Sequence, residues 1–424
     1  MLGKKDKGGG ALGDRVEEKK GVEGSYGGSY SAGLGEQQLK VPYISVGSPF
    51  GLEEAQAVIE AMQGETLTMG KFVTKFQEAF AEYIGVKHAV FVTNCTRAME
   101  VAADCIGIEE GDEVIVPAIT FVATALPALQ RKAKVVFADL EYDTMNIDPN
   151  SVAEKITSRT KAIFPVHHCG LPVDMDAINA LAKPKGIYVV EDCAHSTGAT
   201  YKGRQTGSLG DVGAFSFHTI KNMTTLGEGG MFTTNNSEWA EAVRLHRFVG
   251  MKEYKDQERY WIPYHYDIVA PSRTMAASNS SMTEAQAAVG LVQLAKLDKM
   301  NARRREIAEY WNQEFAELEE LGTPPTPEGR THVYHLYNLY YRKPEKKNDL
   351  MILLLDKYGI QTMIHYIPVY WLTLFREMGY EKGSCPVAER IYAEKLDLPI
   401  YPQLTDAQVE YVAESVKAAV KELN

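Results

Sequence analysis

The chain has 424 residues, of which 45% are hydrophobic, 24% charged and 10% aromatic, as is typical of a globular protein. Its 45 basic and 56 acidic residues give a net charge of −11, which argues against a nucleic-acid-binding protein because that affinity depends on neutralising phosphates. No run of about 18 apolar residues is available to span a membrane, so we expect a cytoplasmic protein without a membrane partner.

The cysteines are odd in number and widely spaced, and none forms a C-x-x-C pair. This pattern predicts neither a disulfide framework nor a metal cluster, and we expect buried thiols and no bound metal. The five positions are Cys95, Cys105, Cys169, Cys193 and Cys385.

Residues 1–40 are rich in Gly, Ser, Lys and Glu and are predicted to form a disordered tail. Helical spacing follows at 53–62 and 71–84. Short apolar runs alternate with helical stretches beyond this point, which predicts an α/β fold with a mostly parallel sheet covered on both faces. The seven runs are 89–92, 114–116, 135–138, 162–166, 187–190, 214–217 and 231–234.

The chain beyond about residue 300 is predicted to form a smaller domain. A long helix starts near Thr283 and runs toward Arg305, and residues 251–275 before it are expected to include a lid or substrate loop. Strands are expected at 332–340 and 360–365, and helices at 349–358 and 388–395. We therefore predict a large domain at 41–295 and a small α+β domain at 296–424.

Ligand sites in sheets of this kind gather where strands end. The first run leads into a helix start at Cys95-Thr96-Arg97, which is a candidate phosphate seat or a plain helix cap. Phe121 follows the second run, either as a ring at the mouth of the sheet or as core. Asp192 and His195 follow the fifth run, where a buried carboxylate needs a partner such as a cationic ring nitrogen.

One lysine, Lys221, follows the sixth run, close after Ser216 and before the glycines of 227–230. A desolvated lysine has a lowered pKa and can form a Schiff base with a carbonyl, although a surface lysine is the commoner explanation of any single Lys. A phosphate seat, an aromatic ring, a strand-end Asp and such a lysine together match the needs of pyridoxal phosphate.

The stretch EDCAHSTGATYKGRQTGSLGDVGAFSFHTIKNMTTLGEGGMFTTN, residues 191–235, resembles the core signature of the DegT/StrS family. Further blocks such as GDEVIVPAITFVATALPAL and PVAERIYAEKLDLPIYPQLTDAQVEYV follow the family's order, over about residues 42–420. The resemblance implies a fold-type-I, pyridoxal-phosphate-dependent sugar aminotransferase.

The resemblance also implies roles for individual residues. Lys221 matches the lysine that binds the cofactor as a Schiff base and moves protons, and Asp192 matches the carboxylate that holds the pyridine nitrogen protonated. The other implied contacts are His195 to the ring hydroxyl, Phe121 to the ring face, Thr96 and Ser216 to the phosphate with Cys95 beside them, and Asn279 to the phosphate of the neighbouring subunit.

The contact of Asn279 with a neighbour implies a homodimer with composite sites. The chain departs from the family pattern at Cys95, where Gly is usual, at Arg97, where a small residue is usual, and at Ser280-Ser281. They concern the phosphate seat and neighbours of Asn279 that often face the substrate in the family.

The implied reaction transfers an amino group from glutamate or glutamine to a keto-sugar, preferably a nucleotide-linked keto-deoxyhexose. A keto-cyclitol or a keto-sugar without a nucleotide is the alternative acceptor, and a non-catalytic sensor or scaffold that binds pyridoxal phosphate is the alternative of another class. Lys221 argues against the family branch that has His there and removes a hydroxyl. A nicotinamide oxidoreductase is set aside because no G-x-G-x-x-G follows the first strand.

Overall fold

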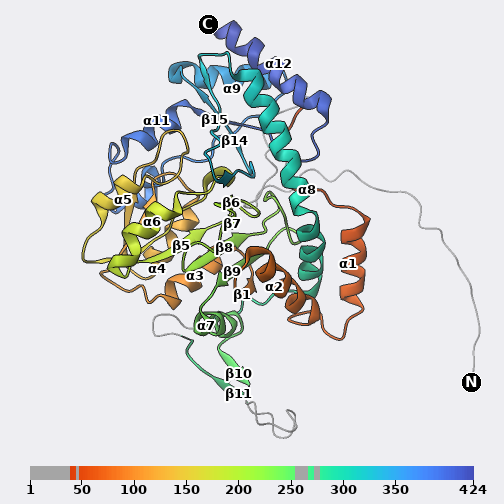
Figure 1. Ribbon diagram of the computed structural model, residues 1–424, viewed down its shortest axis with the longest axis vertical. Coiled ribbons are helices and arrows are strands. Elements are labelled where there is room, and N and C mark those ends of the chain that lie inside the picture. Colours follow the sequence, from red (N-terminus) through yellow and green to blue (C-terminus); the bar gives the residue numbers. More distant parts are fainter. Residues whose placement is uncertain (1–38, 44–46, 254–265, 272–276) are drawn as a thin grey trace, which may run out of the picture. The chain divides into compact units, whose positions relative to one another are not determined.

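The computed structural model describes residues 39–43, 47–253, 266–271 and 277–424 (Figure 1). The tail expected at 1–40 falls outside the described residues except for its last two positions. Most of the loop expected at 251–275 also falls outside them. Among the residues that are described, no helix has the length and hydropathy needed to cross a membrane.

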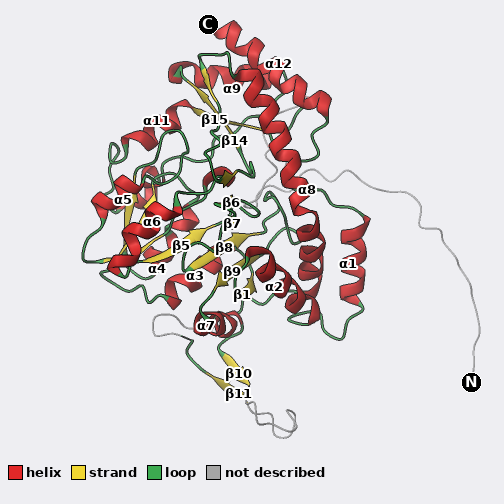
Figure 2. Ribbon diagram, viewed as in Figure 1, coloured by secondary structure: helices red, strands yellow, loops and turns green. Residues whose placement is uncertain are grey.

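A seven-stranded sheet carries the order β1-β9-β8-β5-β4-β2-β3. Its strands β1, β9, β8 and β5 are labelled in Figure 2. Antiparallel pairing joins β9 to β1 and β8, and the other four pairs are parallel. Each of the seven predicted apolar runs overlaps one strand, so the predicted fold class is confirmed. The bounds are β1 His88–Val92, β2 Glu113–Pro117, β3 Lys134–Ala138, β4 Thr160–Ile163, β5 Tyr188–Asp192, β8 Val212–Ser216 and β9 Gly230–Thr234.

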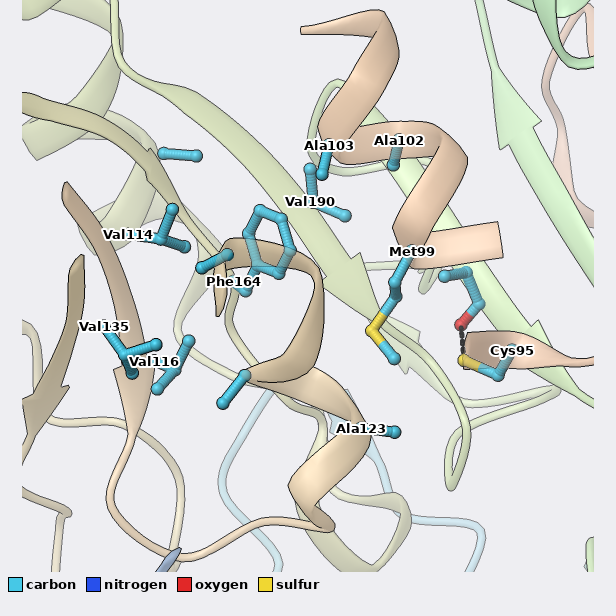
Figure 3. Close-up of a cluster of buried hydrophobic side chains, with 14 of the residues drawn as sticks. Cys95, Met99, Ala102, Ala103, Val114, Val116, Ala123, Val135, Phe164 and Val190 are labelled. Atoms are coloured by element: carbon cyan, nitrogen blue, oxygen red, sulfur yellow. Dashed lines mark hydrogen bonds between the residues drawn. The ribbon is translucent and has the colours of Figure 1, made fainter. Parts of the chain in front are cut away.

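Helices cover both faces of this sheet. Neighbouring residues along a strand point to opposite faces, so one strand contributes side chains to two cores. Val90 and Val92 belong to the core that also contains Met99 of α3 (Cys95–Cys105). Figure 3 shows part of this core. Phe91, between the two valines, instead packs edge-on against Phe76 of α2, with ring centroids 5.1 Å apart.

The helices predicted at 53–62, 71–84, 349–358 and 388–395 are present with their ends shifted by at most two residues, and the long helix extends ten residues beyond its predicted end. The bounds of all the described helices except α3 follow. They are α1 Leu52–Met62, α2 Lys71–Ile84, α4 Leu126–Gln130, α5 Pro149–Lys155, α6 Met175–Ala182, α7 Ser237–Arg247, α8 Glu284–Phe315, α9 Lys347–Asp356, α10 Thr373–Glu377, α11 Pro386–Glu394 and α12 Asp406–Leu423. Short 3-10 helices are η1 Val122–Thr124, η2 His168–Gly170, η3 Lys183–Lys185, η4 Pro344–Lys346 and η5 Val369–Trp371.

Three smaller sheets complete the described strands. One has the order β12-β14-β15 in the C-terminal part of the chain, one has the order β13-β6-β7, and the third is the pair β10-β11. Their bounds are β6 Thr200–Tyr201, β7 Arg204–Gln205, β10 Met251–Glu253, β11 Tyr266–Ile268, β12 Leu321–Gly322, β13 Arg330–Thr331, β14 Tyr337–Tyr341 and β15 Lys395–Leu398.

Two predicted strands are corrected by the structure. The strand expected at 360–365 is wrong, because Ile360 and Met363 each form one isolated bridge, to different parts of the chain, and no ladder results. The strand expected at 332–340 begins only at Tyr337, since the residues before it bond to the turn around Cys169 instead. The expected domain boundary at 295/296 falls inside α8 and stays a prediction.

Candidate active site

The candidate site lies at the carboxyl ends of β5 and β8, beside the turn that follows β1. The segment that follows β8 carries Lys221 and is covered by the chain near Gly47, whose N–H donates to the carbonyl of Thr219 at 2.8 Å. A Cβ on Gly47 would lie 2.2 Å from the carbonyl oxygen of Ile220. Only glycine therefore permits this close approach, which helps to bury the lysine.

Lys221 is a desolvated amine. Its side chain is only 9% exposed, and none of the described residues accepts a hydrogen bond from its Nζ. Burial lowers the pKa of Lys221 to about 8, although the negative charge of Asp192 opposes that shift. This lowered pKa gives the amine a larger neutral fraction near physiological pH than an ordinary lysine has, and the neutral amine is the form that attacks a carbonyl.

Asp192 ends β5 with a carboxylate that three neighbours surround. The Thr124 hydroxyl donates to Oδ2 at 2.7 Å and the Ala194 N–H donates to Oδ1 at 3.0 Å. The sulfur of Cys95 lies 3.8 Å from the same Oδ1. This carboxylate is buried, fixed in orientation, and close enough to Lys221 for its charge to affect that amine.

The side chain of the preceding residue, Glu191, lies on the opposite face of the sheet and has a different role. Its carboxylate accepts three backbone N–H groups, those of Gly207, Leu209 and Gly210, and contacts His167 Nε2 at 2.9 Å. Because His167 Nδ1 accepts the N–H of Val173, its proton is assigned to Nε2 and is donated to Glu191. These contacts make Glu191 a structural residue that holds the turn at 207–210.

The ligand atoms of His167, Glu191 and Cys193 lie within 4.8 Å of one another, as a metal site would require. The hydrogen bonds of His167 and Glu191 already use the lone pairs that a metal would need. Burial also raises the pKa of the Cys193 thiol well above its usual range, which disfavours the thiolate form that binds metals.

His195 is a neutral, oriented imidazole. Its Nδ1 accepts the N–H of Cys169 at 3.3 Å, so its proton is assigned to Nε2, which lies 3.3 Å from the Tyr366 hydroxyl. Burial and then the charge of Lys221 lower the pKa of His195 well below its usual value. The ring of His335 packs beside it, with centroids 4.3 Å apart. His195 therefore offers a fixed N–H at the site.

The start of α3 has free donors. Asn94 caps the helix by accepting the N–H of Arg97 at 2.8 Å, while no described residue accepts the N–H groups of Cys95 and Thr96. The backbone of Asn94 crosses so close to Gly230 that a Cβ there would lie 2.3 Å from its carbonyl carbon. Two free N–H groups at a helix start provide a seat for an anion.

Cys95 faces inward from this turn. Its thiol donates to the carbonyl of Ala214 at 3.3 Å, and Figure 3 shows it at the start of α3 beside Met99. Burial and the charge of Asp192 raise the pKa of the Cys95 thiol well above its usual range. The residue therefore acts as a buried hydrogen-bond donor rather than as a nucleophile.

Two other predicted site residues border this region. Phe121 is 57% exposed and its ring lies 5.8 Å from that of Tyr366, so it offers an open aromatic face. Ser216 ends β8, is buried, and its hydroxyl accepts the N–H of His218 at 3.3 Å. Such a hydroxyl keeps its own hydrogen available for a further acceptor.

Asn279 does not join this cluster in the single chain. It lies on an exposed segment that pairs with Phe248, and its Oδ1 accepts the N–H of Ser281 at 3.1 Å. The neighbouring N–H groups of Ser278 and Ser280 bond to the carbonyls of the last turn of α7. The segment is thus held firmly on the surface rather than beside Lys221.

The sequence analysis did not single out Thr124, Tyr366 and His335. Thr124 follows Phe121 by three residues in a quoted family block, and Tyr366 comes directly after the segment 360–365 that was wrongly expected to be a strand. His335 lies before β14, where an alternating pattern suggested a simple strand. Only their contacts with Asp192 and His195 identify them as part of the site.

Comparison with known proteins agrees with this geometry. The model of the DegT/DnrJ/EryC1/StrS aminotransferase family matches residues 50–417. The chain belongs to this family. It is therefore an enzyme of the aminotransferase class, and the resemblance drawn from residues 191–235 is confirmed.

Curated relatives cover nearly the whole described chain. The spore coat polysaccharide biosynthesis protein SpsC of Bacillus subtilis is 40% identical over 379 residues, which cover 88% of this chain and 95% of the relative. GDP-perosamine synthase of Caulobacter vibrioides is 36% identical over 377 residues, covering 88% and 97%. Both matches include the strands and turns that form the candidate site.

A solved structure shares the architecture of this DegT-family chain. The putative sugar aminotransferase Spr1654 of Streptococcus pneumoniae, in its PMP form, has a TM-score of 0.85 and 26% sequence identity. The match covers 91% of this chain and all of the other. The fold is accordingly that of the fold-type-I aminotransferases.

Proposed function

We propose that the protein uses pyridoxal phosphate to transfer an amino group from glutamate or glutamine to a keto-sugar, preferably a nucleotide-linked keto-deoxyhexose. The observation that carries this proposal is the buried amine of Lys221, with its lowered pKa, near the fixed carboxylate of Asp192. When bound, pyridoxal phosphate supplies a carbonyl that takes up amino groups and a ring that holds the electron pair released at the substrate carbon.

The residues present fit this cofactor in several ways. Lys221 would hold it covalently, Asp192 would pair with the protonated ring nitrogen, and His195 would donate from Nε2 to the ring hydroxyl. Phe121 offers the exposed ring that would cover one face. The free N–H groups at the start of α3 suit a phosphate, as do the hydroxyls of Thr96 and Ser216 beside Cys95.

Lys221 is also the proposed proton carrier. Once an amino substrate has displaced it, its amine is the base for the substrate proton, and the same group later returns the proton as an acid. Its lowered pKa suits both tasks, because efficient general acid–base catalysts have pKa values near the working pH.

We infer a homodimer in which Asn279 contacts the phosphate bound by the second copy. The exposed position of Asn279 and the hydrogen bonds that fix its segment to α7 support this role. Mixing an Asn279→Ala variant with a Lys221→Ala variant should then recover partial activity, because one of the two composite sites in each hybrid keeps both residues. A fully active monomer would rule the inference out.

The preference for a nucleotide-linked sugar rests on similarity. GDP-perosamine synthase, whose name specifies a GDP-linked sugar, shares 36% identity over 88% of this chain. No contact among the described residues distinguishes a nucleotide-linked from a free sugar, so the acceptor is best found by screening.

The deciding experiment is an absorbance spectrum of the purified protein with pyridoxal phosphate, before and after glutamate. We expect a violet band from lysine-bound cofactor that moves into the near ultraviolet on addition of glutamate, and that Lys221→Ala lacks. A band that ignores glutamate and glutamine would favour the non-catalytic alternative. No band at all would contradict the cofactor assignment.

A further inference from the structure

A cleft of about 320 Å³ opens between α2, β1 and α7. It shares no lining residue with the candidate active site. Its size is enough for a small organic anion. Its charged lining is predominantly basic and comprises Lys87, His88, Arg244, Arg247 and one acid, Glu78.

Arg247 is the unusual member of this cleft, because it is a buried cation with no counter-ion among the residues that the structure describes. Only 6% of it is exposed, and its Nη1 donates to the Gln77 side chain at 2.8 Å and to the carbonyl of Phe91 at 3.0 Å. Its Nε is buried with no acceptor, and none of the described carboxylates forms an ion pair with it. Buried charges are normally paired, so a guanidinium of this kind that lines a cleft is suited to bind an anion.

Neighbouring side chains add to the uncompensated positive charge around Arg247. Burial, then repulsion from Arg244, lowers the pKa of Arg247 to about 10. Burial and the charges of Arg244 and Lys87 likewise lower the pKa of His88. Within the described part of the chain, Arg244 forms an ion pair with Glu241, its exposed neighbour on the same helix, at 3.4 Å. Exposed pairs of this kind contribute little and break readily.

We propose that this cleft binds a phosphate group of a small phosphorylated molecule or of inorganic phosphate. Arg247 supplies a rigid guanidinium from the floor, while Arg244 and Lys87 supply mobile charges at the rim. Three cations around one opening suit a dianion better than a single carboxylate, and guanidinium groups match phosphate oxygens in geometry. This site goes beyond the proposed transamination and does not depend on it.

The cleft lies at the C-terminal end of α7, so a bound anion should affect the stability of that helix end. Arg247 is the last residue of α7, and its carbonyl accepts the N–H of Ser280 at 2.8 Å, next to Asn279. A bound anion would remove the repulsion between Arg244 and Arg247 at this helix end. We therefore expect phosphate to raise the thermal stability of the protein.

The test is isothermal titration of the full-length protein, saturated with pyridoxal phosphate so that the proposed cofactor seat is filled. The probes are inorganic phosphate and glycerol 3-phosphate, at constant ionic strength with sodium chloride as reference. We expect one site per chain, with affinity at least about tenfold weaker in the double variant Arg244→Gln/Lys87→Gln, because both substitutions remove a charge that would form a charge-assisted hydrogen bond with phosphate. These substitutions are on exposed side chains and leave the buried Arg247 intact.

Arg376→Gln is the matched control, since Arg376 is also exposed but lies outside the cleft. Tighter binding of glycerol 3-phosphate would identify a phosphomonoester as the ligand, and equal binding would identify inorganic phosphate. Heat no greater than that from sodium chloride would overturn the proposal. Unchanged affinity in the double variant would also overturn the proposal. A change of oligomeric state in the double variant would overturn it as well, because it would mark the cleft as a contact between copies.

Discussion

The hydroxyl of Thr124 donates a 2.7 Å hydrogen bond to the carboxylate of Asp192, across 68 positions of sequence. Thr124 itself lies 2.8 Å from the hydroxyl of Thr120. Because a hydroxyl carries one hydrogen, the arrangement in which Thr120 donates to Thr124, and Thr124 to Asp192, uses both protons. This series of hydrogen bonds fixes Oδ2 of Asp192, while the Ala194 N–H fixes Oδ1.

Replacing Thr124 by Val should weaken cofactor binding without unfolding the protein. The change keeps the shape of the side chain but leaves Oδ2 of Asp192 with one donor fewer, which costs about 1–1.5 kcal/mol. We expect the Kd for pyridoxal phosphate, measured by absorbance titration, to rise roughly five- to tenfold. Thr124→Ser keeps the hydroxyl and should bind normally; equal losses in both variants would show that the hydroxyl is not the cause.

The amine of Lys221 should titrate near pH 8 in the cofactor-free protein. Its lowered pKa means that the neutral, reactive form predominates above about 8, so the rate of cofactor attachment should rise with pH and level off above that value. Asp192 raises the pKa of this amine, and Asp192→Asn should therefore move the midpoint to lower pH. Stopped-flow absorbance measures both profiles, and a midpoint near 10.5 would contradict the burial argument.

Much of the fold and part of the site could be predicted from the sequence. The seven apolar runs predicted the sheet because strands buried on both faces are continuously apolar, and the residues after those runs included Asp192, His195 and Lys221. Polarity at a strand end is a local signal that a sequence displays directly. The opposite roles of Glu191 and Asp192 also follow from strand alternation, although the sequence does not say which side faces the ligand.

The rest depends on contacts between distant segments. Thr124 reaches Asp192, and Tyr366 reaches His195, only because loops from separate strands converge. The segment 360–365 has the composition of a strand. Only Ile360 and Met363 of it form bridges, each to a single residue elsewhere in the described chain, so no ladder forms. Local patterns contain no information on such pairings.

Glu191 should matter for stability rather than for catalysis. Glu191→Gln replaces one acceptor oxygen by an NH₂ group that faces backbone N–H donors at 207–210, so at least one buried donor loses its partner. We expect a loss of about 2–4 kcal/mol in the free energy of unfolding. Urea denaturation measures this, with the exposed Glu317→Gln as control. A change as small as that of the control would show that the turn does not need this carboxylate.

The fully buried pair of Asp104 on α3 and His246 on α7 provides the last prediction. Oδ2 and Nε2 are 2.6 Å apart, and Arg131 lies 3.8 Å from the other carboxylate oxygen. Asp104→Asn removes the negative charge that these two groups share, and breaking a buried pair from one side costs about 3–5 kcal/mol. The carbonyl of His246 also accepts the N–H of Ser278, so the segment of Asn279 should loosen as well.

Two measurements therefore accompany the Asp104→Asn variant. Urea denaturation should show the loss of stability, and hydrogen exchange should show faster exchange of the Ser278 and Ser280 amides, whose acceptors are the carbonyls of His246 and Arg247. Asp267→Asn, an exposed position on β11, should change neither. If stability falls while these amides stay protected, the pair supports the packing of α3 on α7 but does not hold the Asn279 segment in place.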